Sequence, residues 1–122
     1  MGNKIHENEK GYTEIIFEGK QDSESIYKLI EDSLDYNNKL SLQGKQIKTM
    51  LDLTKAGDLD AGAAKQAIGG FSNIDYDKIA IFGASDELTE KLKQILNLTG
   101  KELPVKMFSM KEEAEEWLLA DS

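Results

Sequence analysis

Polar and small residues follow three apolar stretches that read as strands. Asp52 and Thr54 end the stretch Met50–Leu53, Gly83 and Ser85 follow the run 78–82, and Ser109 follows 105–108. Each stretch leads into a helix-forming segment, and repeated strand-to-helix steps predict a parallel sheet with crossover helices. Parallel sheets bind small molecules and phosphates at the carboxyl ends of their strands. We therefore expect these five residues at one edge of the sheet.

Nucleophilic catalysis at this edge would require more than a hydroxyl. A serine nucleophile needs a base that is itself oriented by a third group, and the sole imidazole, His6, lies near the amino terminus, far from Ser85 and Ser109. With 23 acidic residues some carboxylate pair will always lie close, so an acid–base pair carries no specificity. The chain has no cysteine, which excludes a cysteine-ligated metal. We predict no enzyme, no catalytic residue, no cofactor and no metal.

Asp52 allows two interpretations. In the first it is structural, and Asp52 or Thr54 accepts hydrogen bonds from nearby backbone amides to fix a turn. In the second it is the acceptor aspartate of a response-regulator receiver. A receiver needs an acidic pair after its first strand and a lysine after its last, whereas these strands end in Glu18-Gly19-Lys20 and Phe108-Ser109. The structural interpretation is favoured.

The segment Gly83–Asp86 also allows two interpretations. A turn of small residues before a helix can bind an anion through free amides and the helix dipole. Asp86 and Glu87 would repel a phosphate there while stabilising the helix. A capped helix without a ligand is therefore favoured over an anion site.

Charge narrows the classes of partner. The net charge of −8 argues against nucleic acid as a partner, because proteins that bind nucleic acid present basic patches, and against binding to anionic membrane surfaces.

No apolar run approaches about 18 residues, and the amino terminus lacks the apolar core of a signal peptide. We expect a cytoplasmic protein without a transmembrane segment. The acidic run at Glu112, Glu113, Glu115 and Glu116 is either a solvated helix face or a docking surface for a basic partner.

The pattern predicts a single domain over 1–122, with 1–10 as a flexible amino-terminal strand. A hairpin is expected over 4–19, a helix over 21–40 capped by Asp22 or Ser23, a strand over 46–54, and a loop over 53–62. A short helix follows over 63–71, ended by Gly69-Gly70. The remaining elements are a strand over 78–84, a helix over 86–97, an edge strand from Pro104, and a last helix opened by a capping box at Ser109-x-x-Glu112.

The last helix is expected to pack Ala114, Trp117 and Leu118 inward. Alternatively, Met110 and Trp117 form an exposed apolar patch that binds a partner or pairs two copies of the chain. A homodimer is therefore one of the expected assemblies.

From Tyr12 to Leu119 the order of elements resembles the SpoIIAA-like family, within the wider group of STAS-like and SEC14-like domains. The resemblance rests on the segments Met50–Thr54, Lys78–Gly83 and Met107-Phe108, followed by Glu113–Leu118. It implies an α/β fold in which a mixed sheet, antiparallel at the hairpin and parallel afterwards, is flanked by four helices.

The resemblance also implies a bacterial, non-enzymatic regulatory or protein-interaction module. STAS-like regulators are switched by phosphorylation of a hydroxyl at the start of the second helix, where this chain has Asp60-Ala61-Gly62-Ala63. The expected contact surface is the 52–62 loop with the second helix, and its candidate residues are Asp52, Thr54, Asp58, Asp60, Gly62, Gly83 and Ser85.

SEC14-like relatives imply an alternative, a small carrier that binds a lipid-like or other apolar molecule beside the sheet. The pocket would be lined by Ala64, Ile68, Phe71, Leu88 and Leu92. The partners expected from the two hypotheses are thus an unidentified protein or an apolar small molecule.

Overall fold

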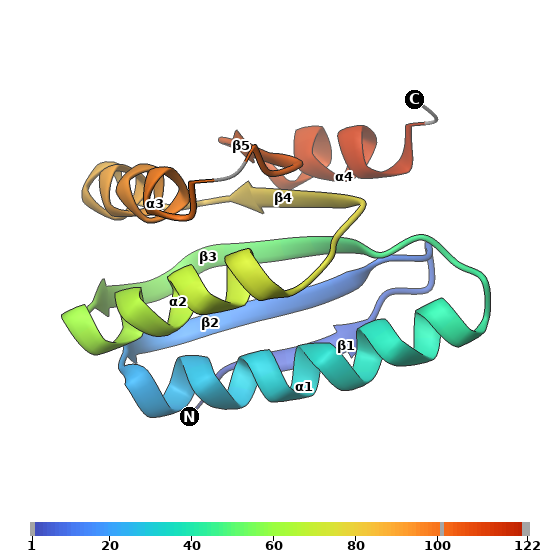
Figure 1. The fold of residues 1–122 in the computed structure, drawn as a ribbon. Coiled ribbons are helices and arrows are strands. Elements are labelled where there is room, and N and C mark those ends of the chain that lie inside the picture. The colour runs from blue at the N-terminus through green and yellow to red at the C-terminus, as the bar shows by residue number, and fades with distance from the viewer. Residues whose placement is uncertain (1, 101, 121–122) are drawn as a thin grey trace.

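The computed structural model describes residues 2–100 and 102–120. Five strands and four helices lie within these residues and form one domain (Figure 1). The elements are β1 (Lys4–Glu7), β2 (Thr13–Gln21), α1 (Ser23–Leu42), β3 (Lys48–Leu59), α2 (Ala61–Asn73), β4 (Lys78–Phe82), α3 (Asp86–Leu98), β5 (Val105–Phe108) and α4 (Lys111–Leu119).

The strands form one mixed sheet in the order β1-β2-β3-β4-β5. β1 is antiparallel to β2, and every later pair is parallel. This confirms the expected hairpin followed by parallel strands. Right-handed crossovers that all advance in the same direction place their helices on the same face of a sheet. The sequential strand order thus explains why α1, α2 and α3 share one face, while α4 covers the other (Figure 1).

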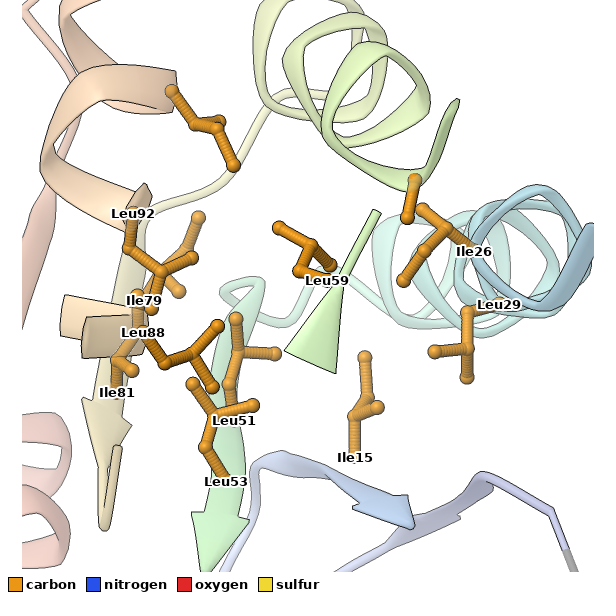
Figure 2. Close-up of a cluster of buried hydrophobic side chains, with 12 residues drawn as sticks. Ile15, Ile26, Leu29, Leu51, Leu53, Leu59, Ile79, Ile81, Leu88 and Leu92 are labelled. Carbon is orange, nitrogen blue, oxygen red and sulfur yellow. The ribbon is translucent and has the colours of Figure 1, made fainter. Parts of the chain in front are cut away.

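Strand register assigns side chains to the two faces. Ile15 pairs with Leu51, Leu51 with Ile81, and Ile81 with Met107, which makes one apolar row across the sheet. This row faces α1–α3 and belongs to the larger core cluster, part of which Figure 2 shows. The next row, through Met50 and Ala80, faces α4.

The smaller core lies between the sheet and α4. Tyr12, Met50, Ala114 and Leu118 are fully buried there. The sequence predicts that Trp117 packs inward as well. Trp117 is half-buried, and its ring centroid lies 5.8 Å from that of Phe108.

The structure corrects the predicted 53–62 loop. β3 runs to Leu59, because Lys55, Ala56 and Leu59 pair with the far end of β2 through two irregularities of register. Gly57 packs so closely on β2 that an added Cβ would lie 3.1 Å from the carbonyl carbon of Gly19. Glycine and aspartate are turn residues in isolation, but pairing with β2 overrides that preference.

Two predicted helix boundaries are also wrong. Gly69-Gly70 does not end α2, which continues to Asn73. Gly70 instead allows α2 to approach α1, since an added Cβ would lie 2.9 Å from Cδ1 of Ile30. Ser109 does not cap α4, because the N-cap residue is Met110, with extended backbone and no side-chain cap.

The starts of α1 and α3 agree with the prediction, whereas α2 begins at Ala61 rather than at residue 63. The Asp22 carboxylate caps α1 by accepting a hydrogen bond from the Ser25 amide at 2.8 Å, and this interaction lowers the pKa of Asp22.

Within the described residues, none of the helices has the length and apolar character that a membrane span requires.

Candidate functional site

Asp52 and Thr54 lie where β3 passes the end of β4. The Asp52 carboxylate accepts hydrogen bonds from the Thr54 amide at 3.0 Å and from the Thr54 hydroxyl at 2.7 Å. This geometry agrees with the structural interpretation of Asp52. The Thr54 methyl group faces Gly83, whose φ is +77°, and a Cβ on Gly83 would lie 2.3 Å from it. The contact explains why glycine follows β4.

Asp58 binds the end of β3 to α3. Its carboxylate forms an ion pair with Lys91 at 2.5 Å, and the Lys91 ammonium also donates to the Leu59 carbonyl at 3.0 Å. The hydrogen bond from Lys91 lowers the pKa of Asp58, and the same interaction raises the pKa of Lys91. Asp58 therefore holds a strand and a helix together.

Asp60 and Gly62 form the start of α2. The Asp60 carboxylate caps the helix by accepting from the Ala63 amide at 2.8 Å. Gly62 lies against the start of α1, where an added Cβ would be 3.2 Å from Cβ of Ser23, and Gln66 donates to the Ser23 hydroxyl at 3.3 Å. The amino ends of α1 and α2 are thus in contact.

Ser85 caps α3, because its hydroxyl accepts from the Leu88 amide at 3.2 Å. An open cleft of about 510 Å³ lies beside this helix start, between the carboxyl ends of β4 and β5. Its polar lining residues are Asp86, Thr89 and Ser109, and no basic side chain lines it. A carboxylate without a balancing cation makes the cleft unfavourable for a phosphate.

Six of the seven candidate residues lie at three places along one edge of the sheet. Asp52 and Thr54 lie beside Gly83, Asp58 pairs with Lys91, and Asp60 and Gly62 form the start of α2, where Gly62 lies against Ser23. The seventh, Ser85, caps α3. The polar side chains among them are engaged in caps, turns or ion pairs. Among the described residues no cluster of three or more histidine, aspartate or glutamate side chains could hold a metal ion.

An apolar cavity of about 100 Å³ lies between the sheet and α1–α3. Of the five residues predicted for such a pocket, Phe71, Leu88 and Leu92 line it, whereas Ala64 and Ile68 do not. Figure 2 shows leucines and isoleucines of its wall, from both the strands and the helices. The full lining is Ile15, Phe17, Gln21, Ile26, Leu29, Ile30, Ser33, Leu51, Leu53, Ala56, Gly57, Leu59, Ala67, Gly70, Phe71, Tyr76, Leu88 and Leu92.

Three polar side chains in this lining were not foreseen from the sequence. The Gln21 amide is satisfied, since it bonds to Asn3, Ser25 and the carbonyls of Glu18 and Gly19. Ser33 is 3% exposed, and its hydroxyl makes no hydrogen bond of ordinary geometry. Burial raises the pKa of Tyr76, and a weaker interaction with Ser33 opposes that rise. The sequence offered one signal for this polar lining, which is the presence of Ser33 on the otherwise apolar stripe of α1.

The α4 face carries a network that was likewise not foreseen. The buried Glu14 carboxylate lies 3.0 Å from the Lys111 ammonium and 3.1 Å from His6 Nε2. Nearby, Glu115 accepts from Lys10 at 2.7 Å and from the Tyr12 hydroxyl at 2.5 Å. These interactions join the hairpin to α4.

Comparison with known proteins identifies the family of this chain. The family model described as SpoIIAA-like matches residues 12–119, so the chain belongs to the SpoIIAA-like family. No match was found among curated proteins.

Two solved structures share the fold. One is an uncharacterised protein with a SpoIIAA-like fold from Shewanella loihica, with 21% identity, a TM-score of 0.60, and coverage of 96% of this chain and 93% of that chain. The other is the anti-sigma factor antagonist SpoIIAA in its unphosphorylated form, with 9% identity and a TM-score of 0.60. The match covers 95% of this chain and 96% of that chain.

Proposed function

We propose that this member of the SpoIIAA-like family is a non-enzymatic regulatory module that binds a protein partner through the end of β3 and the adjoining α2. The observation that carries the proposal is the free edge of β3. β4 pairs with β3 only over Lys48–Asp52, whereas β3 continues to Leu59. Beyond Asp52, its outer edge has no neighbouring strand among the described residues, and such an edge can pair with another chain.

Exposed side chains of both signs surround this edge. Lys55, Gly57 and Asp58 are exposed on β3, and Ala61 and Lys65 are exposed on α2. We call these five residues the β3–α2 surface. A mixed, accessible surface beside a strand edge that no other strand pairs with suits a partner that adds main-chain hydrogen bonds and complementary charges.

The fold supports a regulatory role by analogy. SpoIIAA, which shares this fold, is named an anti-sigma factor antagonist. Because α2 begins with Ala61 and Gly62, partner binding here would not depend on a phosphorylated hydroxyl at those positions. We place this role in the bacterial cytoplasm, as the family resemblance implies.

The test is affinity purification of the tagged chain from its own cells, with partners quantified by mass spectrometry. The double substitution Lys55→Glu/Lys65→Glu reverses two charges on the β3–α2 surface. A matched control, Lys39→Glu/Lys45→Glu, reverses two exposed charges near the end of α1 and the start of β3. We expect the first variant to retain a specific partner at least about tenfold less than the control, as rim charges set association rates. Equal retention by the two variants would contradict the proposal.

A second candidate function, a small-molecule carrier, is favoured by the apolar cavity. An apolar molecule seated in this pocket of about 100 Å³ would remove its apolar wall from water. Its presence is tested by extracting protein purified from its own cells with organic solvent and analysing the extract by gas chromatography–mass spectrometry. An extract identical to that of an Ala67→Leu variant, whose larger side chain fills the cavity, would contradict it.

A further inference from the structure

We propose that two copies of this chain pair through the outer edge of β5, strand against strand in antiparallel order about a two-fold axis at Met107. β5 is the edge strand opposite β1, and among the described residues no strand lies on its outer side (Figure 1). An edge strand presents backbone N–H and C=O groups that can pair with another chain. This assembly is independent of the β3–α2 surface, which belongs to a different strand.

The pairing of β5 with β4 determines which backbone groups of β5 face outward. The Ile79 amide donates to the Pro104 carbonyl at 2.8 Å, so the backbone of Pro104 faces β4. Because these groups alternate in direction along a strand, Lys106 also faces β4, whereas Val105 and Met107 face away from it. The N–H group that proline lacks would face β4, so Pro104 leaves the outer edge intact. Met107 thus directs both its N–H and its C=O group away from the sheet.

A two-fold axis at Met107 makes this edge complementary to itself. Two facing residues of antiparallel strands that direct their backbone groups at each other exchange two hydrogen bonds. The N–H group of each Met107 would therefore donate to the C=O group of the other. The neighbouring pair joins Lys106 of one copy to Phe108 of the other, on the face that α4 covers. Assembly through this edge stops at two chains, because neither β5 then keeps an unpaired side.

Side chains beside this edge are also complementary to those of a second copy. Lys106 is exposed, and its ammonium lies 5.7 Å from the centre of the Phe108 ring of its own chain. Glu113 and Glu116 are exposed on α4 and form no ion pair among the described residues. Glu113 lies one turn before Trp117, whose ring is 5.8 Å from that of Phe108. In the pair, each Lys106 would meet the Phe108 ring and the acidic α4 of the other copy.

The opposite edge of the sheet is less suited to pairing. In β1 the side chains of Lys4, His6 and Glu7 are all exposed, and charged side chains on an edge strand oppose its pairing with another chain. In β5, Lys106 is the one charged residue, and the three others are half-buried and apolar. A second copy is therefore expected at β5 rather than at β1.

The test is sedimentation equilibrium of the full chain, up to a concentration of about 1 mM. A salt concentration of about 0.15 M screens the long-range repulsion between two acidic chains. We expect the wild-type chain to approach twice its mass of 13.6 kDa. Lys106→Glu places a carboxylate beside Glu113 and Glu116 of the other copy and should weaken the dimer at least about tenfold. The matched control, Lys4→Glu, reverses an exposed charge on the opposite edge strand and should leave the dimer unchanged.

Two further measurements identify the strand that pairs and its register. The triple substitution Lys106→Glu/Glu113→Lys/Glu116→Lys exchanges the charges across the axis and should restore the dimer. In a mixture of isotope-labelled and unlabelled chains, an isotope-filtered NOE experiment should detect a contact between the α-protons of Lys106 and Phe108 of different copies. These two residues face each other at the closely spaced position of an antiparallel pair.

Three results would overturn the inference. The first is a wild-type chain that remains monomeric at about 1 mM. The second is a dimer that Lys106→Glu and Lys4→Glu weaken equally, and the third is a dimer without the contact between Lys106 and Phe108. None of these results bears on the β3–α2 surface, because retention of a different protein by that surface is measured separately.

Discussion

At the scale of single residues, the candidate side chains of the carboxyl edge serve the fold. Asp52 orients Thr54, Asp60 and Ser85 cap helices, and Asp58 holds Lys91. The sequence allowed the structural interpretation of Asp52 because short polar side chains commonly bond to nearby backbone amides. It could not reveal the contact of Thr54 with Gly83, which depends on how β3 and β4 lie side by side.

Replacing Gly83 with alanine should be among the most damaging changes at this edge. Alanine would have to adopt φ near +77° and place its Cβ within 2.3 Å of the Thr54 methyl group. The left-handed conformation alone costs about 1–2 kcal/mol. We expect Gly83→Ala to lower the free energy of unfolding by at least about 2 kcal/mol in urea denaturation.

Gly69→Ala is the matched control. Gly69 lies inside α2 with a negative φ and open space around its Cβ position. Alanine there should raise stability by about 0.5–1 kcal/mol through helix propensity. If the two variants change stability equally, the proposed contact at Gly83 is wrong.

Thr49 tests the buried polar atoms of the sheet. It is 1% exposed, and its hydroxyl has no hydrogen-bond partner among the described residues. Its neighbour on β2, Thr13, is also buried and also has a hydroxyl without a partner among these residues. Valine replaces the hydroxyl with a methyl group of similar shape, so Thr49→Val should raise the free energy of unfolding by about 1 kcal/mol. A decrease in the free energy of unfolding, measured by thermal denaturation, would instead show that an ordered water satisfies this hydroxyl.

At the scale of elements, agreement between sequence and structure depended on whether local preference or tertiary pairing decided the outcome. The apolar strands and the stripes of α1 and α3 were predictable from periodicity. The far half of β3 was not predictable, because Gly57 and Asp58 match a loop while pairing with β2 holds this segment in the sheet. Gly69-Gly70 resembled a helix end for the same reason, although Gly70 allows α1 and α2 to approach.

The start of α4 can be improved. Its N-cap residue, Met110, is 56% exposed and makes no side-chain bond to the helix. Serine at this position could accept a hydrogen bond from a first-turn amide, so Met110→Ser should stabilise the chain by about 0.5–2 kcal/mol in urea denaturation. Met110→Ala serves as the control, because it removes the same side chain without adding a cap. Equal stability of the two variants would show that α4 begins elsewhere.

The contact between the hairpin and α4 should make stability depend on pH in the acid range. Hydrogen bonds from Lys10 and then Tyr12 lower the pKa of Glu115 below its ordinary value of 4.5. Because the folded-state pKa is lowered, the stabilisation is complete above about pH 4.5 and is lost as the pH falls through the folded value. We expect Glu115→Gln to reduce the melting temperature by about 3–6 °C at pH 7, and the difference from wild type to shrink below pH 4.5.

Glu116→Gln provides the control, since Glu116 is exposed on the same helix. Its pH profile should follow that of the wild type. A Glu115→Gln profile that stays parallel to the wild type down to pH 3 would show that the contact with Lys10 and Tyr12 does not form in solution.

At the scale of the whole molecule, β3 joins the two proposed binding places. Leu51, Leu53 and Leu59 line the cavity, and Lys55 and Asp58 belong to the β3–α2 surface. The order of elements made the fold and the family predictable from the sequence, and the family match and the shared fold confirm both. The cavity was only partly predictable, because its volume depends on how small residues of α2 and β3 leave space between layers.

The central claim is that this chain acts by binding a protein partner. Native mass spectrometry of the tagged chain, purified gently from its own cells, tests it most directly. The account predicts a complex of defined stoichiometry that releases the 13.6 kDa chain and a different protein on denaturation, and that is diminished by Lys55→Glu/Lys65→Glu but not by Lys39→Glu/Lys45→Glu. A spectrum that contains only the bare chain or its homodimer would contradict it.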